Sequence, residues 1–66
     1  MCIERETLAA AYLEALRDVN ALVVAQGRAL MQGAALDQLD LALARACERR
    51  DSTKAAFLAH ILAHGC

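Results

Sequence analysis

Apolar residues recur with a helical period along two long segments of this chain, and a single glycine separates the segments. In the first segment the apolar positions follow every third or fourth residue, which at about 100° per residue forms one stripe on a helix. This pattern predicts a helix from about 4–7 to about Met31, although Gly27 weakens it by roughly 1 kcal/mol relative to alanine. The stripe consists of Leu8, Tyr12, Ala15, Leu16, Val19, Leu22, Val23 and Leu30.

The second segment carries a comparable stripe and predicts a helix from Leu36 or Asp37 to His64. Between the segments stands Gly33, and a glycine directly after a helix end adopts the left-handed conformation at little steric cost. Arg50 and Lys54 interrupt the second stripe. Its apolar members are Leu36, Leu39, Leu43, Cys47, Phe57, Leu58 and Ile61.

These two helices predict an all-α fold, an antiparallel two-helix hairpin that turns near Gly33 and forms a single domain over 1–66. A hairpin turning at Gly33 pairs positions whose numbers sum to about 67, so Asp18 lies opposite Arg49 or Arg50. The alternative is three helices with a break near 50–53, where good N-cap residues occur. One continuous second helix is favoured because neither glycine nor proline marks such a break.

Composition limits what such a hairpin can bury. The chain has 66 residues, of which 59% are hydrophobic, with 16 alanines and 11 leucines. A single core is marginal at this size, and small scaffolds of this kind are completed by oligomerisation or a partner. The net charge of −1 gives no electrostatic footprint for nucleic acid or acidic membranes. With no apolar run near the roughly 18 residues that span a bilayer, and no signal-peptide pattern, we expect a cytoplasmic protein.

A second apolar strip remains on each helix after the hairpin stripes are assigned. Contiguous exposed apolar surface of this extent marks an interaction site, so we predict a helical protein partner at these positions. An inward-folded three-helix arrangement and a pairing of two hairpins into a four-helix bundle are the alternatives. The predicted partner-binding residues are Leu13, Val24, Met31, Leu41 and Leu62.

Candidate chemistry is sparse, and we expect no enzyme, no catalytic residue and no cofactor. Cys47 lies on the packed stripe and is interpreted as a small buried hydrophobe. His60 and His64 stand four apart, and the hairpin brings Cys2 and Cys66 to the same end, so a zinc site or a Cys2–Cys66 disulfide is geometrically conceivable. We favour solvated histidines interacting with the helix dipole, and hence no metal.

The layout resembles the small co-chaperones of type III secretion needle subunits. The similarity spans nearly the whole chain and rests on its length, its alanine- and leucine-rich first helix, Leu30-Met31-Gln32-Gly33 at the turn, Asp37-Gln38-Leu39 and the apolar close over 55–62. The resemblance implies a helical hairpin that binds a helical-repeat chaperone and, with it, keeps a needle subunit soluble in the cytosol. The alternative function is a homo-oligomeric helical bundle with a regulatory or structural role.

Overall fold

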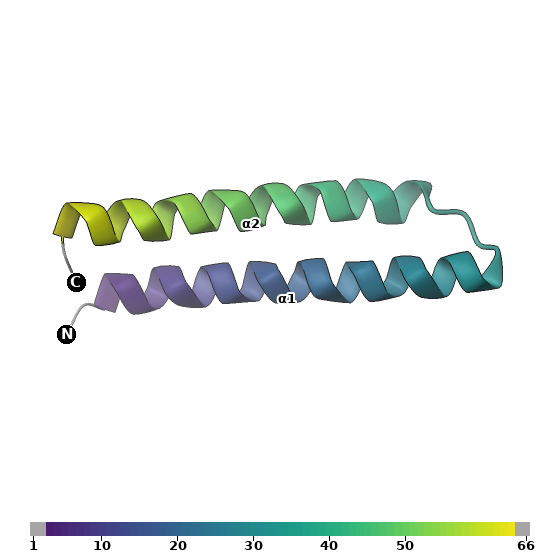
Figure 1. Cartoon of the computed structure of the whole chain (residues 1–66), viewed down its shortest axis with the longest axis horizontal. Helices are drawn as coiled ribbons and strands as arrows, with labels where there is room; N and C mark the ends of the chain where they lie inside the picture. Colours follow the sequence, from purple (N-terminus) through teal and green to yellow (C-terminus); the bar gives the residue numbers. More distant parts are fainter. Residues whose placement is uncertain (1–2, 65–66) are drawn as a thin grey trace.

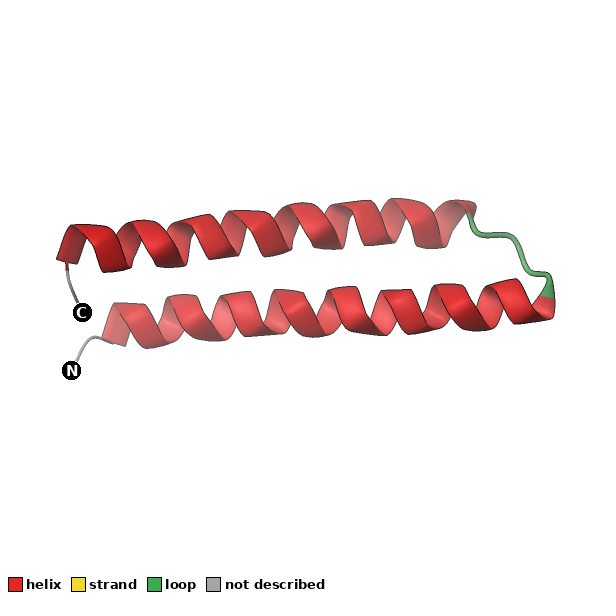
Figure 2. Ribbon diagram, in the orientation of Figure 1, coloured by secondary structure: helices red, strands yellow, loops and turns green. Residues whose placement is uncertain are grey.

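The fold is an antiparallel hairpin of two long helices, described here from a computed structural model of residues 3–64, with the side chains of 3–63. Helix α1 spans Ile3–Gln32 and helix α2 spans Asp37–His64. The two helices lie side by side along their whole length (Figures 1 and 2). The Cα trace measures 49 × 16 × 11 Å with a radius of gyration of 15.2 Å, against about 11 Å for a compact chain of this length. The molecule is therefore a thin rod.

The turn is built on Gly33, as the sequence predicts. Gly33 has a φ of 68°, in the left-handed region. The amide of Ala34 donates to the carbonyl of Ala29 at 2.9 Å, and the amide of Gly33 donates to the carbonyl of Leu30 at 3.2 Å. These two bonds form the Schellman motif, which satisfies carbonyls left open at a helix end. The chain then reverses over 33–36 and enters α2.

Helix α2 is continuous, so the predicted two-helix hairpin is confirmed and the alternative break near 50–53 is not observed. Asp37 and Asp40 stand in its first turn, where negative charge is stabilised by the helix dipole. Thr53 lies where the break was considered. Its hydroxyl donates back to the carbonyls of Arg49 and Arg50, at 2.8 and 3.0 Å. This side chain bonds within the helix instead of capping a new one.

A seam with strict heptad spacing joins the helices, and its best-buried residues are small. Ala15, Ala29 and Ala46 are the hydrophobic residues classed as buried in the described chain, with exposures of 0%, 8% and 8%. Alanine at these points permits close approach of the helices. Successive seam positions differ alternately by three and four residues, the pattern of antiparallel coiled coils. The seam comprises Leu8, Tyr12, Ala15, Val19, Leu22, Gln26 and Ala29 on α1, Leu36 at the end of the turn, and Leu39, Leu43, Ala46, Arg50, Thr53, Phe57 and His60 on α2.

Six residues expected in the hairpin stripes lie outside the seam, and three of them, Leu16, Cys47 and Ile61, are half-buried beside it. The other three, Val23, Leu30 and Leu58, are 50%, 65% and 45% exposed. The sequence prediction placed large aliphatic residues in the core, whereas Gln26 and Ala29 occupy the corresponding seam positions of α1. A heptad seam and a freely drawn 3.6-residue stripe diverge by about 20° per heptad, which moves Val23 and Leu30 to the edge.

The predicted register is confirmed by polar contacts across the seam. Arg49 forms an ion pair with Asp18, and these two numbers sum to 67. Closer to the turn, the side-chain amide of Gln26 donates to a carboxylate oxygen of Asp40. Neither contact is deeply buried, since Arg49 and Asp18 are each more than half exposed. Such pairs contribute little stability but fix the alignment of the helices.

Candidate functional site

The hairpin has two long sides on which both helices contribute residues, and the Arg49–Asp18 pair marks one of them. Leu16 and Cys47 precede Asp18 and Arg49 by two residues each. Two residues rotate a helix position by about 200°, across the seam to the opposite edge. Leu16 and Cys47 therefore lie together on the other side of the hairpin, at the same level along the rod.

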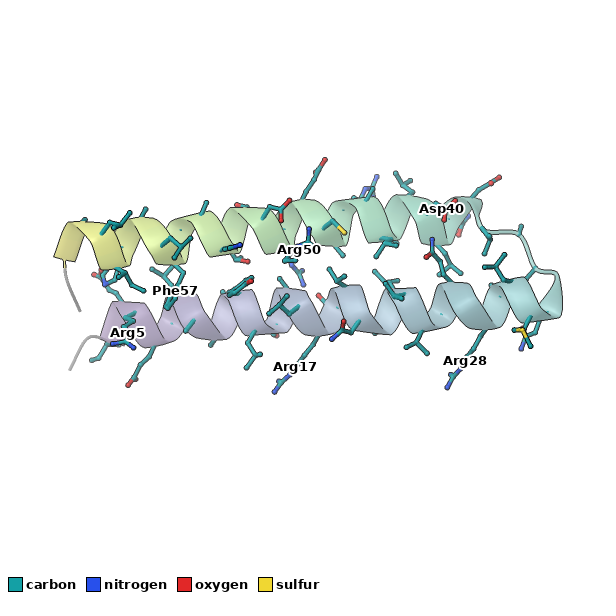
Figure 3. All side chains as sticks on the ribbon, in the orientation of Figure 1. Arg5, Arg17, Arg28, Asp40, Arg50 and Phe57 are labelled. Atoms are coloured by element: carbon teal, nitrogen blue, oxygen red, sulfur yellow. The ribbon has the colours of Figure 1, made fainter. Side chains whose placement is uncertain are left out.

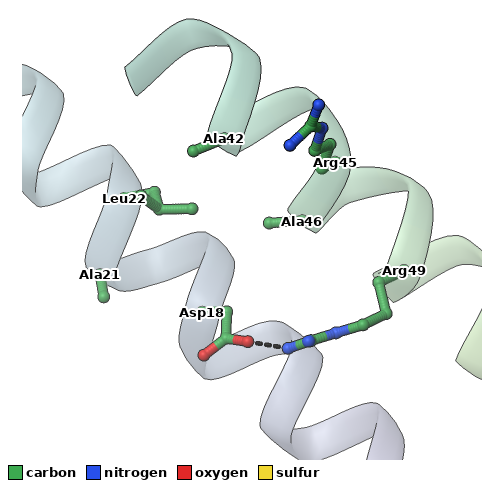
Figure 4. Close-up of a pocket in the computed structure, with 7 residues that line it drawn as sticks. All are labelled: Asp18, Ala21, Leu22, Ala42, Arg45, Ala46 and Arg49. Carbon is green, nitrogen blue, oxygen red and sulfur yellow. Dashed lines mark ion pairs between the residues drawn. The ribbon is translucent and has the colours of Figure 1, made fainter. Parts of the chain in front are cut away.

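The first side, which we call the alanine side, carries short side chains around the ion pair. A shallow groove of about 480 Å³ lies there, with the Arg49 side chain reaching across from α2 to Asp18 on α1 (Figure 4). Its floor is formed by Leu22 and alanines from both helices. The alanine side comprises Ala11, Asp18, Ala21, Ala25, Ala42, Arg45, Arg49 and Ala56.

The second side, which we call the aliphatic side, exposes large apolar side chains. Its members on α1 recur at intervals of seven residues, flanking the seam. Val23 and Leu30 are at least half exposed, and Leu13, one step further out, is 49% exposed. The aliphatic side comprises Ala9, Leu13, Leu16, Val23, Gly27 and Leu30 on α1, and Asp40, Cys47, Lys54, Leu58 and Ile61 on α2.

The structure distributes the five predicted partner-binding residues over different faces. Val24 and Met31, 53% and 89% exposed, follow Arg17 at intervals of seven, and Arg17 points away from α2 (Figure 3). They therefore occupy the outer face of α1. Leu41 and Leu62, 53% and 86% exposed, are 21 residues apart on the outer face of α2.

Leu13 belongs with the aliphatic side and not with either outer face. The outer faces of α1 and α2 point in opposite directions, so one flat partner surface does not contact Val24, Met31, Leu41 and Leu62 together. All five residues are accessible. Their role as a partner-binding set stays a prediction.

His60 differs from its expected solvated state. Its side chain is 8% exposed, and its Nδ1 lies 3.5 Å from a carboxylate oxygen of Glu4. The reason is register, because position 60 is a seam position and faces the start of α1. Cys2, Cys66 and the side chain of His64 lie outside the described residues, and so do the zinc site and disulfide that need them. Within the described part, no cluster of three or more metal-ligating side chains occurs.

Basic residues in the middle of α2 are engaged by neighbouring carboxylates. Arg50 Nε donates to Asp51 Oδ1 at 3.0 Å. This hydrogen bond and the charge of Asp51 raise the pKa of the Arg50 guanidinium above its ordinary value. Arg50 lies half-buried at the seam with its charge paired to Asp51. Cys47, one turn before it, is a half-buried free thiol and not a fully buried one.

Sequence reasoning missed the aliphatic side as a unit, because it assigned Val23, Leu30 and Leu58 to the hairpin core. The signal that identifies it is the interval of seven residues among Ala9, Leu16, Val23 and Leu30. Ala46 was also missed as a seam residue, since alanines occur throughout the chain.

No family model matches the sequence, and neither the curated proteins nor the solved structures include a significant match. No described helix combines the length and the apolar character needed to cross a membrane.

Proposed function

We propose that this chain is a non-enzymatic, cytoplasmic binding module whose apolar surface is completed by other helices. The observation that carries the proposal is the surface it leaves open. The chain exposes 4947 Å², whereas a compact protein of 7.1 kDa exposes about 4,100 Å². The surplus of roughly 800 Å² equals what one partner buries in a standard protein–protein interface.

The chemistry of the exposed surface supports the same function. Nine large hydrophobic side chains in the described part are 45% exposed or more, whereas the residues classed as buried are alanines. Burying apolar surface contributes about 25 cal/mol per Å². Most of the free energy that holds the chain in a defined assembly therefore comes from burying these large side chains against other chains.

In its specific form, the proposed function is that of a co-chaperone in a type III secretion needle system, which follows from the sequence resemblance. The partners are then a helical-repeat chaperone and a needle subunit. The outer face of α1, with Val24 and Met31, is the contact surface for one of them, since it is the most exposed apolar strip outside the two sides.

The test is a capture experiment from native cytosol with the tagged full-length chain. The wild type is compared with Val24→Asp/Met31→Asp and with a matched control, Gln38→Asp/Ser52→Asp, which adds the same two charges at exposed positions of α2 away from this face. Retention of one helical protein by the wild type and the control, and its loss from the Val24/Met31 variant, supports the function. Equal retention by all three contradicts it for this face. Circular dichroism verifies that each variant stays helical.

A further inference from the structure

We propose that the aliphatic side pairs with the aliphatic side of a second copy of this chain, around a two-fold axis that crosses the rod at Asn20 and Cys47. This inference rests on the proposed binding function and names the partner for one surface. The two hairpins stack face to face with their turns at opposite ends. Helix α1 then runs antiparallel to α1 of the partner copy, and α2 runs antiparallel to α2.

First, the aliphatic row of α1 and the charged pair of α2 are centred at the same level along the rod. On α1 the aliphatic residues Ala9, Leu16, Val23 and Leu30 are centred between 19 and 20. On α2 the corresponding row is Asp40, Cys47, Lys54 and Ile61, and its two charged members, Asp40 and Lys54, are centred on Cys47. The hairpin register, in which opposite positions sum to about 67, places Asn20 beside Cys47. A single two-fold axis therefore serves both helices.

The second argument is the match of sizes across that axis on α1. Antiparallel pairing about Asn20 sets Leu16 against Val23 and Ala9 against Leu30 of the second copy. On the outer row it sets Leu13 against Gly27, and a Cβ at Gly27 meets no atom within 4 Å in the single chain. Each large residue thus faces a residue small enough, or exposed enough, to accept it.

The third argument is charge complementarity on α2. The same axis sets Asp40 of one copy against Lys54 of the other, and it does so twice. The Asp40 carboxylate also accepts a hydrogen bond from the Gln26 amide of its own chain. Within one chain the two residues are fourteen positions apart on a helix, which is about 21 Å. They do not reach each other in the hairpin. No ion pair to Lys54 occurs among the described residues, so its charge is available to a second copy.

The alanine side does not offer this pairing. Asp18 and Arg49 already neutralise each other there within one chain. None of the large exposed hydrophobic residues of the described chain lies on that side. A second copy placed there buries mainly alanine methyl groups, which contribute less per residue than leucine or valine. The aliphatic side is the stronger interface.

Sedimentation equilibrium and a charge exchange test this arrangement in the full-length, reduced protein. The wild type is expected at twice the 7.1 kDa chain mass. Lys54→Asp places like charges together in both symmetric pairs and should weaken self-association by ~10-fold. Adding Asp40→Lys to that variant restores opposite charges and should recover most of the loss. Failure of the double variant to recover overturns the proposed pairing, because recovery requires contact between chains.

Cross-linking at Cys47 gives a second readout that leaves the interface unchanged. Cys2→Ser/Cys66→Ser leaves Cys47 as the single thiol, and a short bismaleimide should join two chains in high yield. The matched control moves the thiol to the alanine side, as Ala42→Cys with Cys47→Ala, and should yield little dimer. A dimer that cross-links through residue 42 and not through Cys47 overturns the inference.

The outcomes also separate this inference from the proposed function. A monomer that still captures a helical protein through Val24 and Met31 overturns the dimer and leaves the binding function standing. A monomer that captures nothing and melts cooperatively on its own contradicts both.

Discussion

The two sides of the hairpin are built from the same two helices but differ in how their charged and apolar side chains are paired. On the alanine side, Asp18 and Arg49 close the surface with an ion pair inside one chain. On the aliphatic side, Val23 and Leu30 stay half exposed or more, and Lys54 is without an ion pair in the described structure. The alanine side pairs its charges within one chain, whereas the aliphatic side leaves large apolar side chains exposed. The exposed apolar surface of the hairpin is therefore concentrated on particular faces.

The largest expected change in self-association comes from placing charges on the aliphatic side. Val23→Lys/Leu30→Lys removes two apolar residues per chain from the proposed dimer and should weaken self-association by at least ~100-fold, because each buried valine or leucine contributes about 1.5–3 kcal/mol. Sedimentation equilibrium measures it. The matched control, Ala25→Lys/Ala42→Lys on the alanine side, should leave the dimer intact; equal effects of both variants would contradict the contrast.

The next largest effect falls on the seam that both sides share. Ala46→Leu adds bulk where Ala46 is 8% exposed and should destabilise the fold by about 2 kcal/mol, because overpacking forces the helices apart. Urea unfolding followed by circular dichroism gives the value. Ala44→Leu, two residues away on an exposed surface, serves as the control and should change the unfolding free energy by less than ~0.5 kcal/mol.

Gly27→Ala should separate the stability of the chain from its self-association. The added methyl meets open space in the single chain and should raise helix stability by about 1 kcal/mol. In the proposed dimer the same methyl faces Leu13 of the second copy and should weaken pairing a few-fold. Thermal melts and sedimentation on one sample measure both effects. A tighter dimer would show that Leu13 and Gly27 do not meet.

The smallest expected effect concerns the ion pair on the alanine side. Asp18→Asn should cost less than ~1 kcal/mol of unfolding free energy, because both partners are more than half exposed. The loss should shrink further at 1 M salt, where charges are screened within about 3 Å. Arg49→Gln is the companion variant, and the two losses should not add. A loss above 2 kcal/mol would indicate a pair that is buried in an assembly.

Much of the fold follows from sequence, because strong local signals specify it. Gly33 is the residue at which a left-handed turn is least costly, and the pairing of Asp18 with Arg49 follows from counting outward from it. The uninterrupted helix through Asp51 follows from the lack of glycine and proline there. In each case a backbone preference and the register agree.

The distribution of burial followed less well from sequence. Val23, Leu30 and Leu58 were expected in the core because they are large and apolar, but a heptad seam selects position over size. His60 was expected in solvent near the chain end, but its seam position places it against Glu4. The apolar period identifies a helix face only to within one neighbouring heptad position. Whether a leucine is buried or exposed depends on which of these positions it occupies. The assignment of Leu13, Val24, Met31, Leu41 and Leu62 to a partner stays a prediction.

The slender shape of the hairpin has a consequence for how it tumbles. A thin cylinder 49 Å long rotates faster about its long axis than end over end, and backbone amide relaxation by NMR reports that anisotropy. Stacking a second copy on the aliphatic side doubles the girth and extends the length by only about 8 Å, because the axis at Asn20 lies close to the middle of α1. Rotational anisotropy should therefore fall even though the mass doubles, whereas assembly end to end would increase it.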